Sequence, residues 1–265
     1  SSQSFRSKRE TRYVTKMTTI NGAPEKYVYG GEYQLTASVP NGSTGGTWSW
    51  STTTPTDVLR IENETTANPT IKALKASDTA VTLTVTYSDD NRAGTATVDV
   101  KKVDKRPVTI TGLSVVPKVY DGTDTATITG SPMLEGLVQN GDVTLSGPPT
   151  ATFDTPDAGT DKKVTISGYT LTGNGSAEDN YTLTQPTGIK VNITPKNISG
   201  ENITLNTAPT YDGTKKQVTI SGVTVDGNTL TMSDYDIAAD TDKATNVESK
   251  ELKITGKGNY GGEAR

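Results

Sequence analysis

An internal repeat constrains the fold of this chain more than any other feature of the sequence. The tetrapeptide Tyr-Asp-Gly-Thr occurs at 120–123 and again at 211–214, an offset of 211 − 120 = 91 residues. Each copy is followed within a few residues by a Thr-Ile-Thr-Gly or Thr-Ile-Ser-Gly run. Self-similarity at a long, nearly fixed spacing indicates tandem modules, each built on the same plan.

Two further matches follow in the same order along both copies. Val-Thr-Ile-Ser-Gly at 164–168 matches Leu-Lys-Ile-Thr-Gly at 252–256, and Asn180-Tyr181 matches Asn259-Tyr260. The offset has shrunk to 259 − 180 = 79 residues at the last match. Shortened loops would produce this change, because loops tolerate deletions whereas strand registers do not.

Short strands are predicted between these matches. Hydrophobic residues are 31% of the chain and aromatic residues 6%, too few for one large core but enough for several thin β-sandwiches. Val81, Leu83, Val85 and Tyr87 alternate with polar residues, which is the period of a strand with one buried face. Val, Ile and Thr fill such runs, and Gly, Asp and Asn lie between them. The predicted fold class is all-β.

Prolines and the phase of the repeat divide the chain into three predicted modules. Pro107 and Pro195 stand at the two junctions, where a proline ends ladder pairing and stiffens the linker. The predicted divisions are a mobile arm or first-strand lead-in at 1–16 and β-sandwiches at 17–105, 106–195 and 196–265. Three separately closed sandwiches in a row would form an elongated particle.

The repeated tetrapeptide has two interpretations, a bend or an active site. Asp-Gly is a strong signal for a tight turn because both residues tolerate φ > 0 at little cost. Each tyrosine would then cover the edge of its sandwich, with its hydroxyl reaching a backbone group. A catalytic role needs a base or electrophile repeated in both copies, and the copies diverge directly after the motif. The bend is favoured, and its residues are Tyr120, Asp121, Gly122, Tyr211, Asp212 and Gly213.

Composition excludes several classes of function. The chain has no histidine and no cysteine, which removes Ser-His-Asp triads, His-ligated zinc, disulfides and thiol nucleophiles. Two carboxylates alone can serve a glycosidase, but the repeats leave little chain for a catalytic scaffold. We therefore expect no enzyme, no catalytic residue and no cofactor.

Charge and hydropathy narrow the range of partners. The net charge is -4 with acids and bases interspersed, so no basic stripe is present to bind a nucleic-acid backbone. No apolar run approaches the roughly 20 residues that span a bilayer. Neither nucleic-acid binding nor membrane insertion is expected.

Three stretches resemble known module families. VYDGTDTATITG at 119–130, with AGTDKKVTISGYTLTG and KVNITPK after it, resembles the YDG-repeat domains of large bacterial surface proteins. PTYDGTKKQVTISG with ITGKGNY is similar to related Ig-like modules, and TWSWSTTTPTDVLRIE resembles bacterial Ig-like group 2 domains. The resemblance implies Ig-like β-sandwiches in a non-catalytic extracellular stalk or adhesion region at a bacterial cell surface. Its ligand would be an unidentified host or surface molecule, protein or glycan.

Trp48 and Trp50 are the candidate ligand-binding residues. They lie two apart, so in a strand both side chains point to the same face. On the outer face they would form a stacking platform for sugars or a host protein, and on the inner face they would fill a core that has few Phe residues. Burial of at least one is favoured, and a carbohydrate-binding or host-protein-binding module is the alternative function.

Acidic clusters are candidates for calcium, which takes oxygen ligands. They occur at 89–90, at 154–161 and at 234–242. None reproduces the spacing of an EF-hand loop. Solvated turns are the favoured interpretation, and no metal site is predicted.

The third module is predicted to lack its closing strand. The second module has the alternating run 188–193 after Asn180-Tyr181, and by the offset of 79 the counterpart of Ile189 would fall at 189 + 79 = 268. An open strand position leaves backbone groups unpaired and favours an incoming strand. We expect it either to be filled by strand exchange with another chain, through the arm around Tyr13-Val14-Thr15, or to fray.

Overall fold

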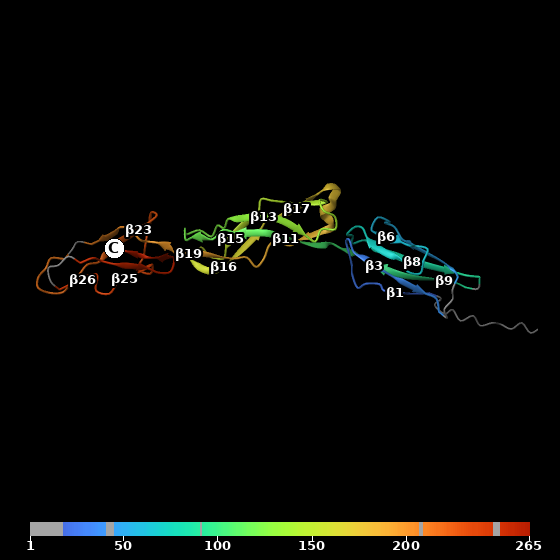
Figure 1. Cartoon of the computed structure of the whole chain (residues 1–265), viewed down its shortest axis with the longest axis horizontal. Coiled ribbons are helices and arrows are strands. Elements are labelled where there is room, and N and C mark those ends of the chain that lie inside the picture. The colour runs from blue at the N-terminus through green and yellow to red at the C-terminus, as the bar shows by residue number, and fades with distance from the viewer. Residues whose placement is uncertain (1–17, 41–44, 91, 207–208, 246–249) are drawn as a thin grey trace, which may run out of the picture. The chain divides into compact units, whose positions relative to one another are not determined.

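A computed structural model describes residues 18–40, 45–90, 92–206, 209–245 and 250–265 (Figure 1). Within these residues the regular structure is strand, apart from the 3-10 segment η1 (Asn174–Asn180). The predicted all-β class, built of Ig-like β-sandwich modules, agrees with this structure. The predicted arm at 1–16 and its strand around Tyr13-Val14-Thr15 lie outside the described residues.

The described chain packs into two compact units. The first contains the described residues up to Thr109 together with Leu134–Leu145 and Leu171–Thr184. The second contains Ile110–Met133, Ser146–Thr170 and Gln185–Arg265. The division runs through the predicted middle module, at neither of the proline-bearing junctions. Parts of the middle module therefore pack with the segment before it, and other parts pack with the segment after it.

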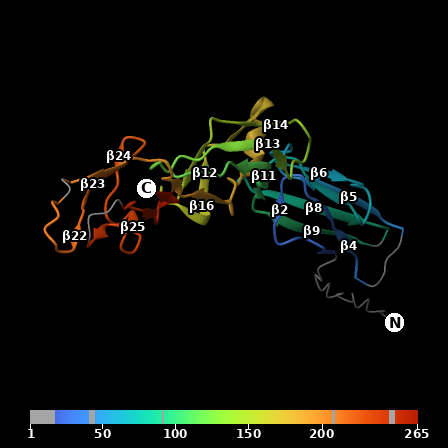
Figure 2. The same ribbon diagram turned by 60° about the vertical axis from the view of Figure 1, so that its left-hand side comes forward.

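Two three-stranded antiparallel sheets form the N-terminal sandwich, in the orders β5-β8-β9 and β3-β7-β6. β1 pairs with β4, and β2 pairs in parallel with β10. β8 and β9 lie side by side in both views (Figures 1 and 2), and β5 pairs with the other edge of β8. The strands are β1 (Thr19–Asn21), β2 (Tyr27–Val28), β3 (Glu32–Gln34), β4 (Thr36–Ser38), β5 (Thr47–Thr52), β6 (Leu59–Glu62), β7 (Thr70–Ala73), β8 (Val81–Ser88), β9 (Ala93–Val100) and β10 (Val103–Asp104).

The core of this sandwich follows the predicted alternation. Val81, Leu83, Val85 and Tyr87 on β8 are all buried, and the threonines between them are not. Full burial of such a side chain contributes about 1.5–3 kcal/mol. The alternating pattern of β8 therefore holds this strand in its register against β5 and β9.

The segment from 106 to 194 forms three sheets, in the orders β13-β11-β18, β12-β19-β16-β15 and β14-β17. β18 pairs in parallel with the start of β11, and β19 pairs in parallel with β12. The strands are β11 (Arg106–Val115), β12 (Lys118–Val119), β13 (Ile128–Glu135), β14 (Val143–Ser146), β15 (Thr150–Phe153), β16 (Gly159–Ser167), β17 (Thr170–Gly173), β18 (Tyr181–Leu183) and β19 (Lys190–Thr194).

The C-terminal segment has shorter strands, in the orders β21-β23-β24, β25-β27-β29, β22-β26 and β20-β28. β28 pairs in parallel with β20, and Ala264 on β29 is buried. The strands are β20 (Lys196–Asn197), β21 (Ile203–Leu205), β22 (Lys216–Gln217), β23 (Ile220–Val225), β24 (Asn228–Thr229), β25 (Tyr235–Ile237), β26 (Lys243–Ala244), β27 (Ile254–Gly256), β28 (Tyr260–Gly261) and β29 (Glu263–Ala264).

One match of the repeat differs from the sequence alignment. β27, the strand that precedes Asn259-Tyr260, pairs with β25. The strand that precedes Asn180-Tyr181 in the middle segment is β17, which pairs with β14. The run 164–168, which the sequence aligned with β27, belongs instead mainly to β16, paired with β15 and β19. Both strands of the middle segment carry a Thr beside a branched apolar residue and end near a glycine, so local pattern alone did not separate them.

Candidate functional site

The two Tyr-Asp-Gly-Thr segments form bends of the same construction. Gly122 has φ 78° and Gly213 has φ 88°, a region that side chains other than glycine adopt at a cost. One carboxylate oxygen of Asp121 accepts hydrogen bonds from the backbone N–H and the hydroxyl of Thr123. The threonine therefore closes the bend as an Asx turn.

The second bend repeats these contacts. Asp212 accepts hydrogen bonds from the backbone N–H and the hydroxyl of Thr214, and Lys216 donates to its other carboxylate oxygen. At the first bend the lysine is Lys118, which donates to Asp121 at 2.9 Å. At Asp121 all three donors share the Oδ1 atom, whereas Asp212 uses both of its oxygens. Each carboxylate thus binds the backbone N–H of its bend, and the geometry is that of a structural turn.

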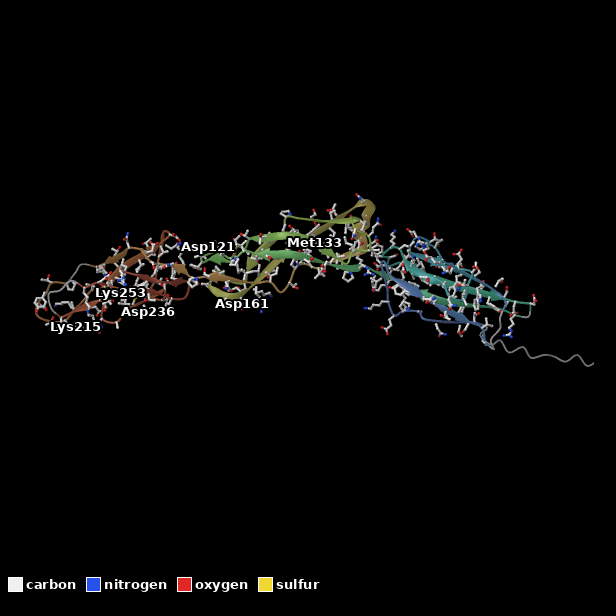
Figure 3. The ribbon with its side chains drawn as sticks, viewed as in Figure 1. Asp121, Met133, Asp161, Lys215, Asp236 and Lys253 are labelled. Atoms are coloured by element: carbon white, nitrogen blue, oxygen red, sulfur yellow. The ribbon has the colours of Figure 1, made fainter. Side chains whose placement is uncertain are left out.

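The electrostatics agree with this role. The Lys118 ammonium, followed by the Thr123 backbone and hydroxyl groups, lowers the pKa of Asp121 from 3.8 to about 2. Lys216 and then Thr214 lower the pKa of Asp212. A general base that works near neutral pH needs a raised pKa, so neither aspartate is poised for proton transfer. Figure 3 shows Asp121 as sticks.

The tyrosine of the first bend packs against a hydrophobic cluster that lies further along the chain. Tyr120 is partly buried against the cluster that contains Ile198, Val223, Ile254 and Tyr260. Its ring meets the Tyr260 ring edge-on, with 5.5 Å between centroids, a favoured arrangement for aromatic pairs. The sequence had placed Tyr120 on the edge of its own sandwich, and the structure places it against the next core.

A side-chain amide completes this contact. The Oδ1 atom of Asn259 accepts a hydrogen bond of 2.7 Å from the backbone N–H of Ala158. Its Nδ2 atom donates to the Asp157 carboxylate at 3.0 Å. We define the second joint as Tyr120, Ala158, Asn259 and Tyr260, all within the second compact unit.

The same arrangement occurs once more, in the first compact unit. The Tyr29 ring meets the Tyr181 ring edge-on at 5.3 Å, and the Oδ1 atom of Asn180 accepts a 2.9 Å hydrogen bond from the backbone N–H of Ala76. Tyr29 packs against the cluster of Val108, Val143 and Tyr181. We define the first joint as Tyr29, Ala76, Asn180 and Tyr181.

Backbone pairing places both tyrosines in the same register. The Tyr29 N–H donates to the carbonyl of Asp104, and the Tyr120 N–H donates to the carbonyl of Thr194. Two residues after each carbonyl, Arg106 pairs in parallel with Tyr181, and Lys196 pairs in parallel with Tyr260. The two joints are therefore built by equivalent positions of backbone as well as of side chain.

Close packing explains why a glycine follows the tyrosine at the first joint. Gly30 has φ 79°, and a Cβ atom placed on it would lie 2.3 Å from a methyl carbon of Val138. The Arg106 guanidinium donates a 2.8 Å hydrogen bond to the carbonyl of Tyr29. The bend thus sits tightly between two segments that follow it in sequence.

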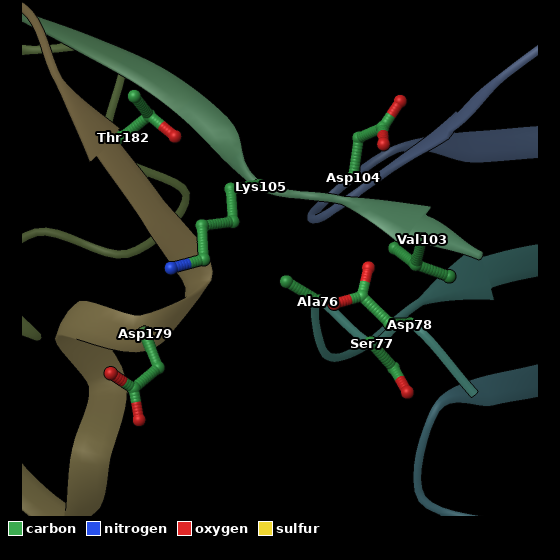
Figure 4. Close-up of a pocket in the computed structure, with 8 residues that line it drawn as sticks. All are labelled: Ala76, Ser77, Asp78, Val103, Asp104, Lys105, Asp179 and Thr182. Atoms are coloured by element: carbon green, nitrogen blue, oxygen red, sulfur yellow. The ribbon is translucent and has the colours of Figure 1, made fainter.

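A shallow pocket lies beside the first joint (Figure 4). Lys105 extends to the side of the pocket that carries Asp179, away from Asp78 and Asp104. The other lining residues are Ala76, Ser77, Val103 and Thr182. Within the described residues no group of three or more His, Cys, Asp or Glu side chains is arranged to hold a metal ion.

The tyrosine hydroxyls at the joints lie in desolvated surroundings. Burial, followed by the hydrogen bond of 2.6 Å to the Asp142 carboxylate, raises the pKa of Tyr181. Burial also raises the pKa of Tyr260. The phenols of Tyr181 and Tyr260 therefore stay protonated over the physiological pH range.

Trp50 is buried in the N-terminal core, and its indole N–H donates to the carbonyl of Thr66 at 2.9 Å. Trp48 is partly buried against the same core, with its ring 4.7 Å from that of Tyr87. Both side chains thus point to one face, the inner one, where they fill space between the sheets. Binding of a ligand by the exposed part of Trp48 stays a prediction.

Sequence reasoning found the Asn-Tyr pairs but missed what they touch. Their partners lie 104 and 101 residues away along the chain, so no local pattern connects them. It also missed Tyr29, because this copy of the bend reads Tyr-Gly-Gly in place of Tyr-Asp-Gly. Two signals together could have identified Tyr29: the Tyr-x-Gly spacing that it shares with Tyr120, and its position ahead of the Asn180-Tyr181 pair in the sequence.

The fold and the two joints define a tandem β-sandwich protein in which a bend tyrosine of one segment packs against the hydrophobic cluster of a later segment. Residues 104–189 match the family model of the YDG domain, and this match and the fold suit a surface or binding module in general. No curated protein matches the chain. Two solved structures match the chain at low similarity, an I-band fragment of titin (12% identity, TM-score 0.26) and a Glu-to-Ala variant of the same titin domains (11% identity, TM-score 0.27). Each match covers 93% of this chain and 95% of the titin chain.

No helix in the described residues is long and apolar enough to cross a membrane.

Proposed function

We propose that the chain is a non-catalytic stalk or adhesion region of a bacterial cell-surface protein, exposed outside the cell. The observation that carries the proposal is the repetition of the joint. The same tyrosine, the same amide and the same parallel backbone pairing connect successive segments twice. A protein that spaces a ligand-binding part from a surface needs connections of this kind, because free linkers would let each module swivel independently.

Three further features support the proposal. The chain has no histidine or cysteine, and its repeated aspartates are occupied in turns. The resemblance of 104–189 to the YDG domain fits a surface module. Ligand recognition would then belong to loops or partner domains carried by the stalk.

Labelling of intact cells tests this location. In the bacterium that encodes the chain, an antibody raised against it should label unbroken cells, and brief protease treatment of those cells should remove the signal. A cytosolic protein labelled in parallel serves as the control for cell integrity. Signal that appears only after lysis would overturn the proposal.

A further inference from the structure

The third tyrosine of the repeated bend has no partner ring in the described part of the chain. Tyr29 and Tyr120 each pack against a cluster and meet a second tyrosine edge-on. Tyr211 is 49% exposed, the value of a surface side chain. An aromatic ring of this size exposed at a position where two equivalents are covered indicates a contact surface.

The bend beneath Tyr211 is already formed. Gly213 has the same left-handed φ as Gly122, and Asp212 holds Thr214 through the same pair of hydrogen bonds that Asp121 makes with Thr123. The backbone that presents the ring is thus preorganised, which lowers the entropic cost of docking.

We propose that the bend at 211–213 is an acceptor surface for a further β-sandwich module that presents an Asn-Tyr pair at the start of a strand. The tyrosine of that module would meet Tyr211 edge-on, as Tyr181 meets Tyr29 and Tyr260 meets Tyr120. Its asparagine would directly precede that tyrosine, as Asn180 precedes Tyr181 and Asn259 precedes Tyr260.

The occupant is a different module, and not a second copy of this chain. Both Asn-Tyr pairs of the chain are engaged within the chain, since Asn180 binds Ala76 and Asn259 binds Ala158. A second copy could offer Tyr211 such a pair only by opening one of its own joints. The inference does not depend on where the protein works.

The test extends the full chain so that a further Asn-Tyr pair follows Asn259-Tyr260 at the same offset of 79 residues that separates Asn259-Tyr260 from Asn180-Tyr181. Because Asn180 corresponds to Asn259, Pro186 corresponds to Arg265 (186 + 79 = 265). A second copy of residues 187–265 appended after Arg265 therefore continues the pattern; this copy carries Tyr211→Phe, so that the nitrated peptide reports only the original Tyr211. The rate of nitration of Tyr211 by tetranitromethane, read by peptide mass spectrometry, should fall about tenfold in the extended chain. With Asn259→Ala and Tyr260→Ala in the appended copy alone, the rate should return to that of the original chain.

A peptide provides a second measurement that needs no folding of the extension. Residues 177–184, AEDNYTLT, added to the original chain should slow nitration of Tyr211, and the same peptide with Asn180→Ala and Tyr181→Ala should not. Unchanged nitration of Tyr211 in both experiments, with Tyr120 still protected, would overturn the proposal. Protection of Tyr211 in the original chain that grows with its concentration would identify a second copy as the occupant and also overturn it.

Discussion

Replacement of Tyr120 by alanine should destabilise a segment to which Tyr120 does not belong in sequence. Its ring is partly buried against the cluster formed by Ile198, Val223 and Ile254. Truncation of a fully buried aromatic side chain costs about 3–5 kcal/mol, and loss of an edge-on ring pair costs about 0.5–1.5 kcal/mol. Since Tyr120 is only partly buried, we expect the free energy of unfolding of the 196–264 segment to fall by ~2 kcal/mol.

Native-state hydrogen exchange with mass spectrometry locates this loss along the chain. Backbone amides of β23 and β27, near Val223 and Ile254, should exchange about 30-fold faster in Tyr120→Ala, the factor equivalent to ~2 kcal/mol. Amides of β8, in the N-terminal sandwich, should exchange at an unchanged rate.

Tyr211→Ala is the matched control. It removes the same residue from the same kind of bend, but its ring is exposed, so its effect should stay within about 0.5 kcal/mol. Faster exchange confined to the strands that flank Tyr120 itself, with β23 and β27 unchanged, would refute the reasoning.

Three further outcomes follow from the same structure. Gly122→Ala should lower the free energy of unfolding by about 1–2 kcal/mol, because Gly122 has a φ of 78°. The space around Gly122 is open, so the loss would come from the backbone alone. Gly222→Ala is the control: Gly222 lacks such a φ, and its replacement should be nearly neutral in thermal unfolding. Asp121 has a folded pKa of about 2 against its ordinary 3.8, so its contribution is present above pH 3.8 and lost as the pH falls through about 2. The difference in melting temperature between the original chain and Asp121→Asn should therefore be largest above pH 4 and vanish near pH 2; a constant difference would contradict this. Trp50→Ala should destabilise the N-terminal sandwich by about 3–5 kcal/mol in denaturant unfolding. Trp48→Ala should destabilise it by less, because Trp48 is only half-buried. Equal losses for the two variants would contradict the observed difference in burial.

The bends and the alternating strands could be predicted from sequence because their causes are local. Asp-Gly favours the left-handed φ that Gly122 adopts, and the alternation from Val81 to Tyr87 specifies which face of β8 is buried. These signals lie within a few residues of the structure that they determine. The same holds for the face that Trp48 and Trp50 share, which follows from their spacing of two.

The joints could not be predicted because their causes are distant. Nothing near Tyr120 indicates that its ring packs beside Ile254, and nothing near Ala158 indicates an amide from Asn259. The sequence correctly predicted that the Tyr120 ring covers apolar side chains. It predicted the wrong ones, because the ring packs against the cluster of the following segment and not against its own sandwich. The partner of Tyr120 depends on the register of β20 and β28, which places Tyr260 beside Lys196, and this register is not encoded near Tyr120.

Proton–proton nuclear Overhauser effects between tyrosine rings test the central claim most directly. In the folded chain the account predicts cross-peaks between Tyr29 and Tyr181, whose ring centroids lie 5.3 Å apart, and between Tyr120 and Tyr260, at 5.5 Å. It also predicts no cross-peak from the Tyr211 ring to another ring of the described residues. Absence of both cross-peaks in a chain whose sandwich cores give dispersed, protected signals would contradict the account.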